Sequence, residues 1–492
     1  MGASACTAGD TRFSFQAIHR LLIHPVQRTT FYKSSGILAA IALLVLGGRV
    51  AWAVDIEGVL PGSLAQPQVH GLLQPAGGGD PYTSDIFIGA FNVVGYLDTG
   101  SSGIVISDLT RELLALPTEP GVNFEDVAAG GTTDFDVSVP INVRINSTNH
   151  PDINNIDTYE SVYDKSYGPL RAQVGPNDSI YDIYGMPTML GKHVVLDPKQ
   201  SDEVLLLSAP AYIYEPGTPF NPATQNTNPG IPTTSHHVQL SYGEFDRFTR
   251  LTPSDAEPPV LAHNPFIGPN PTAGLFDEEV TDDAPPVRFT FGGRETSGSL
   301  LLDTAGGASF ISTPLAAELG VRLVDPFDFE NPQLEMFDPD NPQLPGTLIE
   351  NQFSLALQGV DGAVIPIAGF YLDEMVLQTL EGGPDLHDPD NLRFLGAPFL
   401  VNDIYLEADT GEELILDGIL GMNFLLDSVS VDGLNIEEAA SPFNWVTFDE
   451  PNGILGLDLG GVVPEPSSFA LAACGLAALA ALAHRRRRAL KS

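Results

Sequence analysis

Two copies of one short pattern lie 205 residues apart in the chain. The first reads YLDTGSSGIVIS at residues 96–107, and the second reads LLLDTAGGASFIS at residues 300–312. In register, Asp98 matches Asp303. Apolar residues lie on both sides of each Asp-Thr pair, which predicts a strand, a sharp turn with a carboxylate at its tip, and another strand. The repeat therefore predicts a chain folded as two halves of one plan.

A second pair of segments supports this prediction. YDIYGMPTML (181–190) follows the first copy, and LDGILGMNFL (416–425) follows the second. Both contain apolar residues, Gly-Met, two further residues and another apolar residue. From the aspartate to the glycine the distance is 87 residues in the first half and 118 in the second. Gly185 and Gly421 therefore occupy equivalent places.

The composition favours β structure. The 492 residues are enough for two to four domains or lobes, and 43% of them are hydrophobic, as in folded proteins. The 49 glycines and 41 prolines indicate many turns and long loops rather than helical bundles. We therefore expect an all-β architecture.

Residues 1–53 have the pattern of a signal peptide. The apolar run ILAAIALLVLGG (37–48) is followed by Ala51-Trp52-Ala53, whose small residues suit cleavage by signal peptidase before Val54. A retained membrane anchor is the alternative, but about twelve apolar residues are short of the roughly twenty that a span needs. Four basic residues precede the apolar run: Arg12, Arg20, Arg28 and Lys33.

The segment 462–492 has three features in a fixed order. VVPEPSS leads into the apolar helix former FALAACGLAALAALA, which ends at HRRRR. The basic cluster stays on the cytoplasmic side of a membrane, so the preceding chain lies outside. The segment resembles the PEP-CTERM sorting signal of Gram-negative bacteria. This resemblance implies that an exosortase-type membrane protease acts at Pro464, Glu465 and Pro466. An ordinary C-terminal anchor is the alternative.

These ends predict an exported protein in the periplasm, at the cell surface or outside the cell, attached to the membrane transiently or permanently through its C-terminal helix. Residues 54–466 contain 12 basic and 62 acidic residues, a net charge of −50. This charge argues against nucleic acid as a partner, because phosphate binding needs clustered lysines and arginines. It is typical of solubility in saline or Ca-rich surroundings, with work at low pH as the alternative. Both cysteines, Cys6 and Cys474, lie in the end segments, so no disulfide or cysteine metal site is expected between them.

The paired turns resemble those of the pepsin-like and retropepsin-like aspartic proteases. Residues 98–102 read DTGSS, as in the pepsin form, and residues 301–304 read LLDT, as in the retropepsin form. The resemblance implies an all-β, bilobal pepsin-like fold, in which two pseudo-symmetric β lobes enclose a cleft. The implied divisions are an N-terminal lobe at 54–250, a Pro-rich acidic linker at 251–287 and a C-terminal lobe at 288–461.

A pair of aspartates can hydrolyse a peptide bond without a covalent intermediate. One group must take a proton from the attacking water, and another must protonate the carbonyl oxygen or the leaving amine. Two carboxylates a few ångströms apart cannot both ionise, so they share one proton. The resemblance implies that Asp98 and Asp303 are this pair, acting on peptides or proteins as a monomer, with no cofactor and no metal.

The resemblance also implies supporting roles for nearby residues. Thr99 and Thr304 would cross-link the two turns through bonds from their hydroxyl groups to the backbone. Ser101 would hydrogen-bond Asp98 and keep it ionised. The remaining supporting positions are the third motif positions Gly100 and Ala305, and the close-packing glycines Gly185 and Gly421.

The second turn departs from the family. Ala305 replaces a glycine, and Gly306 replaces the hydroxyl residue of pepsin-like members. The methyl group is tolerated if φ is negative, because the backbone N–H that faces the carboxylate remains, whereas a positive φ would strain the turn. The alternative function is therefore a catalytically inactive, protease-like cell-surface protein that binds peptides or extracellular matrix polymer.

Other segments give weaker signals. Residues 135–146 (FDVSVPINVRIN) are a candidate for the flap hairpin of the family, but they contain no tyrosine; the next tyrosines are Tyr159, Tyr163 and Tyr167. FDPDNP (337–342) and HDPDNL (387–392) are acidic turns without the ligand spacing of a calcium loop. His236-His237 has no third metal ligand in view. The sequence has no nucleophile-elbow motif that would indicate a Ser-His-Asp hydrolase.

Overall fold

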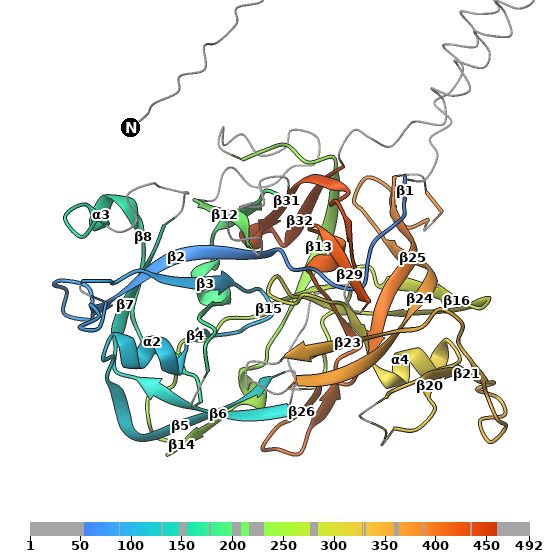
Figure 1. The fold of residues 1–492 in the computed structure, drawn as a ribbon, viewed down its shortest axis with the longest axis horizontal. Helices are drawn as coiled ribbons and strands as arrows, with labels where there is room; N and C mark the ends of the chain where they lie inside the picture. The colour runs from blue at the N-terminus through green and yellow to red at the C-terminus, as the bar shows by residue number, and fades with distance from the viewer. Residues whose placement is uncertain are drawn as a thin grey trace, which may run out of the picture. The chain divides into compact units, whose positions relative to one another are not determined.

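The computed structural model describes residues 54–459, with gaps at 88, 129–130, 147–154, 177–178, 199–207, 216–230, 276–283, 327, 329–330, 359–363, 386, 389 and 433–434. The expected signal peptide and the expected sorting signal, with Pro464, Glu465 and Pro466, lie outside these residues. The described chain is mostly β structure, in agreement with the composition (Figure 1). Of its helices, none is both long enough and apolar enough to cross a membrane.

The first copy of the repeat forms two strands joined by the Asp98 turn. β3 (Val93–Leu97) enters the turn and β4 (Ile104–Ile106) leaves it. β10 (Ile183–Tyr184) lies between them, parallel to β3 and antiparallel to β4. α2 (Asp108–Leu113) follows, and its first turn is capped by the Ser107 side chain, which accepts a bond from the Thr110 N–H.

The second copy forms the same arrangement. β18 (Leu300–Leu302) enters the Asp303 turn and β19 (Phe310–Ile311) leaves it. β28 (Gly418–Leu420) lies between them, parallel to β18 and antiparallel to β19. α4 (Thr313–Glu318) is capped by Ser312, which lies 205 residues after Ser107. The repeat in sequence is therefore also a repeat in structure.

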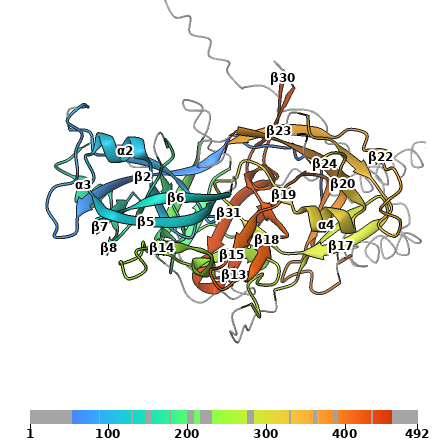
Figure 2. The same cartoon turned by 90° about the horizontal axis from the view of Figure 1, so that it is seen from below.

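A central antiparallel sheet contains strands from both halves of the chain. Its order is β12 (Ser208–Tyr214), β11 (His193–Leu196), β31 (Phe443–Asp449), β32 (Ile454–Leu459) and β13 (His236–Gly243). The β11–β31 pair joins segments about 250 residues apart. In Figures 1 and 2, β31 lies between the first-half strands β5 (Thr118–Ala128) and β6 (Gly131–Ser138) and the second-half strand β24 (Val364–Leu377).

The remaining elements surround these three parts. The strands that complete the sheet around the first turn are β2 (Gln66–Pro75), β7 (Ile141–Ile145), β8 (Lys165–Leu170), β9 (Gln173–Val174) and β14 (Arg250–Thr252). Those around the second turn are β1 (Val54–Ile56), β15 (Asn264–Ile267), β16 (Val287–Phe291), β17 (Arg294–Gly298), β23 (Phe353–Gln358) and β25 (Leu392–Val401). Three small sheets are β20 (Val321–Leu323), β21 (Leu334–Met336) and β22 (Thr347–Leu348); β26 (Tyr405–Glu407) and β27 (Glu413–Ile415); and β29 (Ser428–Asp432) and β30 (Asn435–Ala439). The short helices are α3 (Tyr159–Val162), η1 (Met186–Thr188), η2 (Asp246–Phe248), η3 (Met422–Phe424) and η4 (Glu450–Asn452).

Two pairings cross the divisions expected from the sequence. β1 opens the first half but pairs in parallel with β25 of the second half. β15 lies inside the segment 251–287, which the sequence predicted to be a linker, and pairs with β18. The segment between the two repeats is therefore partly built into the sheets.

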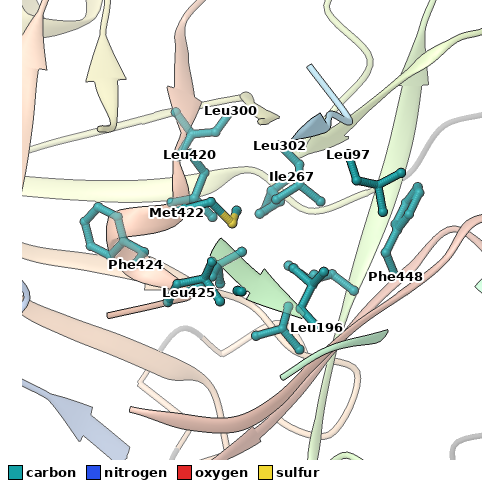
Figure 3. Close-up of a cluster of buried hydrophobic side chains, with 14 of the residues drawn as sticks. Leu97, Leu196, Ile267, Leu300, Leu302, Leu420, Met422, Phe424, Leu425 and Phe448 are labelled. Atoms are coloured by element: carbon teal, nitrogen blue, oxygen red, sulfur yellow. The ribbon is translucent and has the colours of Figure 1, made fainter. Parts of the chain in front are cut away.

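One apolar core lies behind both turns. Leu97 of β3 and Leu302 of β18 contribute to it from the two halves, and Leu196 and Phe448 contribute from the central sheet (Figure 3). Leu97 and Leu302 are 1% and 0% exposed. The strands that lead into the two aspartates share this core with the central sheet. Packing therefore fixes the positions of these strands relative to each other.

Candidate active site

Asp98 and Asp303 meet at the tips of the two turns. Their side chains are hydrogen-bonded to each other. Asp98 is 7% exposed and Asp303 is half-buried. Each aspartate also donates its backbone N–H to the strand inserted beside it: Asp98 to the Tyr184 oxygen at 3.1 Å, and Asp303 to the Leu420 oxygen at 3.0 Å. The inserted strands β10 and β28 thus position both carboxyl groups.

Thr99 and Thr304 cross-link the two turns, as the sequence suggested. The Thr99 N–H donates to the Thr304 hydroxyl oxygen at 3.0 Å, and the Thr304 N–H donates to the Thr99 hydroxyl oxygen at 3.2 Å. The Thr99 hydroxyl donates to the Leu302 carbonyl, and the Thr304 hydroxyl donates to the Leu97 carbonyl, both at 2.5 Å. Four reciprocal bonds between buried groups therefore hold the aspartates in one geometry.

Backbone N–H groups face both carboxyl groups. The Gly100 N–H donates to Asp98 Oδ1 at 2.7 Å, and the Ser101 N–H also bonds Asp98. The N–H groups of Ala305 and Gly306 donate to Asp303 Oδ1 at 3.0 and 2.7 Å. Ala305 is not among the residues with positive φ, so its methyl group does not strain the turn. The departure from the family pattern therefore leaves the N–H donors in place.

Burial raises the pKa of both aspartates. Burial raises the pKa of Asp98 well above its usual range, and the charge of Asp303 and the bond to it raise this pKa further. Burial also raises the pKa of Asp303, but the bond from Asp98 and the N–H groups of Gly306 and Ala305 oppose this rise. Both shifts favour a pair that shares one proton, and the titration belongs to the pair.

Ser101 hydrogen-bonds Asp98 as expected, but through its backbone N–H and not through its hydroxyl. Its hydroxyl donates to the Gly103 carbonyl at 3.1 Å, and only its backbone N–H reaches Asp98. This N–H bond opposes the rise that burial causes in the pKa of Asp98.

Gly185 and Gly421 pass close behind the turns. A Cβ atom at Gly185 would lie 2.6 Å from the Ser101 oxygen, and one at Gly421 would lie 2.8 Å from the Gly306 oxygen. Their φ angles are −77° and −89°, so it is the lack of room, not the backbone angle, that requires glycine. Met186 and Met422, the next residues, donate their N–H groups to the same two oxygens at 2.9 and 2.7 Å.

The hairpin beside the first turn is formed by β5 and β6, not by residues 135–146. β5 and β6 pair from Asn123↔Asp136 to Ala128↔Gly131, while β7 pairs with β2 and β8. Pro140 separates β6 from β7, because proline interrupts a strand. Phe135 of β6 packs against Val105 of β4, which places the hairpin next to the first turn.

The three tyrosines that follow in the sequence have other environments. Tyr159 lies in α3, where its ring contacts the Arg144 guanidinium. Tyr163 is fully buried against Phe91. The Tyr167 hydroxyl donates to the Thr188 carbonyl at 2.7 Å.

The sequence did not point to Gln66 and Asn264, which also contact the turns. Gln66 Nε2 donates to the Ala305 carbonyl at 2.5 Å, and Asn264 Nδ2 donates to the Thr99 carbonyl at 2.9 Å. Both residues begin a strand and both precede a proline. This shared amide-proline pattern, one copy ahead of each Asp-Thr turn, is the signal that could have revealed them.

The candidate metal ligands are engaged in other bonds. The ring of His237 bonds Glu381 Oε1 at 2.6 Å and the Thr234 hydroxyl at 2.9 Å. Asp338 and Asp388 accept bonds within their own acidic turns. In the described part of the chain, no three His, Cys, Asp or Glu side chains are grouped so that they could hold a metal ion.

No protein-family model matches the chain, and no curated protein matches it. The case for a function therefore depends on the chemistry of the Asp98–Asp303 pair.

Proposed function

We propose that the protein is an aspartic endopeptidase with a bilobal fold of the pepsin-like or retropepsin-like type, and that Asp98 and Asp303 are its catalytic residues. The observation that supports this most is the hydrogen-bonded pair of aspartates at the tips of two equivalent, cross-linked turns. A structural role explains such a pair poorly, because burying two carboxyl groups against each other costs stability.

Because the pair shares one proton, one carboxyl group acts as the base and the other as the acid, with the proton placed on Asp98 in the following steps. Asp303, ionised, takes a proton from a water molecule as the water oxygen attacks the peptide carbonyl carbon. Asp98, protonated, gives its proton to the carbonyl oxygen, which produces a neutral tetrahedral diol. As the C–N bond breaks, Asp303 passes its new proton to the leaving amine and a diol hydroxyl returns a proton to Asp98. The pair then has its original single proton.

We further propose that this enzyme works outside the cytoplasm, on peptides or proteins. The support is the sequence of the two ends and the charge of −50 between them. Signal peptidase would release the N-terminal segment, and an exosortase-type enzyme would process the tail.

Peptide cleavage by the purified protein tests the proposal. A mixed peptide library is incubated from pH 3 to 8 with the wild type, Asp98→Asn and Asp303→Asn, with and without pepstatin. Asp182→Asn is the matched control, because Asp182 is another buried aspartate whose pKa is raised by burial, and it bonds Thr110 and Ser107 instead of the pair.

We expect cleavage by the wild type and the control, and a loss of at least about 10³-fold in both pair variants, since each removes an acid or base of the reaction. If the folded wild type cleaves nothing at any pH, or if the pair variants cleave as well as the wild type, the proposal is wrong. The inactive peptide-binding or matrix-binding protein is then the function to pursue.

A further inference from the structure

We propose that Gln66 and Asn264 are positioning residues for the aspartate pair, each holding the peptide plane whose N–H group donates to one aspartate. This inference depends on the proposed function, in which Asp98 and Asp303 are catalytic. Neither residue touches a carboxyl group in the bonds described above. Each acts through a backbone carbonyl on the far side of a peptide unit.

The first of these peptide units joins Ala305 to Gly306. Gln66 Nε2 donates to the Ala305 carbonyl oxygen of this unit at 2.5 Å, and the Gly306 N–H of the same unit donates to Asp303 Oδ1 at 2.7 Å. A trans peptide is planar, and its C=O and N–H bonds point in opposite directions. The bond from Gln66 therefore fixes the direction of the N–H group that Asp303 accepts.

The second peptide unit joins Thr99 to Gly100 and has the same two bonds. Asn264 Nδ2 donates to the Thr99 carbonyl oxygen of this unit at 2.9 Å, and the Gly100 N–H of the same unit donates to Asp98 Oδ1 at 2.7 Å. Asn264 is 0% exposed, and its Oδ1 has no hydrogen-bond partner among the described residues. An acceptor buried without a partner costs stability, so the contribution of this side chain lies in its donor.

Each amide comes from the strand system of the opposite turn. Gln66 begins β2, which pairs with β3 of the first turn, but it holds the second turn. Asn264 begins β15, which pairs with β18 of the second turn, but it holds the first. The prolines that follow, Pro67 and Pro265, have fixed φ angles, which stiffens the backbone at both amides. The arrangement thus repeats with the same exchange in both halves.

The effect on the reaction follows from what the two N–H groups do. A bond to a carboxylate favours its ionised form and lowers its pKa. The charged group that faces each carboxyl is the other aspartate; the remaining neighbours are the N–H groups of the turns. Releasing the Gly306 N–H should raise the pKa of Asp303, and releasing the Gly100 N–H should raise that of Asp98.

The pH profile of kcat/KM tests both effects. Activity appears on the acidic side as the pair loses its first proton and disappears on the alkaline side as the pair loses its second proton. Gln66→Met and Asn264→Ala should each move a limb to higher pH, because each variant releases an N–H group that favours an ionised carboxyl group. Each should also lower kcat by about tenfold with little change in KM, because the geometry of an acid or base is disturbed.

Two matched controls exist in the chain. Gln74 lies in the same strand as Gln66, and its Nε2 donates to the Gly79 carbonyl at 2.8 Å. Asn391 is 0% exposed like Asn264, and its Nδ2 donates to the Asp385 carbonyl at 2.8 Å. Gln74→Met and Asn391→Ala should leave both limbs in place. If Gln66→Met and Asn264→Ala lower activity evenly across the pH range without moving a limb, the two amides are structural and the inference is wrong.

A wild type that cleaves nothing would refute the proposed function but not the role of the two amides. A measurement of Tm tests that role without activity. A carboxyl whose pKa is raised in the folded state stabilises the fold below its unfolded pKa, and this contribution is lost as pH rises through the folded pKa. Asp303→Asn removes that loss, so its Tm diverges from the wild-type Tm over the range in which Asp303 ionises. In the Gln66→Met background this divergence should extend to higher pH. An unchanged range would overturn the role of Gln66.

Discussion

Asp98 and Asp303 place two carboxyl groups where water reaches them poorly. Burial is the largest cause of the raised pKa of each, and the N–H groups of Gly100, Ala305 and Gly306 offset only part of it. At the scale of single residues the pair is therefore a cost to the fold, offset by contacts elsewhere.

This cost predicts a pH-dependent stabilisation by Asp98→Asn. Below the unfolded pKa of aspartate, about 4, both forms of Asp98 are protonated and the substitution should change Tm little. As pH rises through the raised folded pKa, the wild type loses stability and the variant does not. We expect the Tm of the variant to exceed that of wild type by a few degrees at pH 7, measured by calorimetry from pH 3 to 8. A constant difference over this range would contradict the raised pKa.

The sequence was a good guide to residues inside the motifs. Thr99, Thr304, Gly185 and Gly421 lie where the repeat placed them, because each is fixed by its spacing from an aspartate. Ser101 bonds Asp98 through its N–H and not through its hydroxyl, because the rotation of the hydroxyl decides its partner. Gln66 and Asn264 escaped notice because they reach turns more than 160 residues away.

At the scale of elements, the geometry of each turn depends on a strand that lies between the two strands flanking the turn. β10 leads into Gly185, and β28 leads into Gly421. Each glycine lies against backbone carbonyl oxygens of the turn beside it. A side chain at Gly185 or Gly421 would push the inserted strand away from the aspartate that bonds it.

Gly185→Ala and Gly421→Ala should each destabilise the protein by about 3 kcal/mol, because the added methyl group overlaps backbone that cannot move without breaking the turn. Gly77→Ala is the matched control: a Cβ there meets nothing within 4 Å and φ is not positive, so its effect should be within about 1 kcal/mol of zero. Denaturant unfolding measures all three. If Gly185→Ala or Gly421→Ala lowers the free energy of unfolding no more than Gly77→Ala does, the turns accommodate the added methyl group and the prediction is wrong.

At this scale, residues 135–146 do not form one hairpin. They include Pro140, which cannot donate to a strand ladder, and the hairpin beside the first turn pairs β5 with β6 from Asn123↔Asp136 to Ala128↔Gly131. The hairpin is also linked to the second half: Arg250 of β14 bonds Glu125 of β5 at 3.0 Å and Asp409, between β26 and β27, at 2.5 Å. Ion pairs between distant segments leave no local pattern in a sequence.

At the scale of the whole molecule, the two halves share the central sheet and the bonds between Thr99 and Thr304. The β-rich composition and the repeat predicted the class of structure and its duplication. They could not predict that β11 would pair with β31, because the register between such distant strands depends on packing and not on local preference.

The net charge of residues 54–466 belongs to this scale too. Among the described residues, ion pairs are seen at nine basic residues. Because 12 basic residues stand against 62 acidic ones, the cationic side chains are too few to pair with most of the carboxylates. Salt weakens the ion pairs, which contribute about 0–1 kcal/mol each at a surface, but it also screens the repulsion among some fifty uncompensated carboxylates. The repulsion acts over the whole surface and should be the larger effect.

We therefore expect Tm at pH 7 to rise by about 3 °C between 20 mM and 500 mM NaCl, since a protein of this size shifts by roughly 1 °C per kcal/mol and the screened repulsion should contribute about 3 kcal/mol. The rise should be smaller at pH 4, where protonation has already removed part of the charge. MgCl₂ and CaCl₂ at equal ionic strength distinguish screening from binding: equal shifts indicate screening, whereas a larger shift with calcium would indicate specific binding of calcium. A Tm that falls with NaCl would mean that the ion pairs outweigh the repulsion, and the acidic surface would then need an explanation other than tolerance of salt.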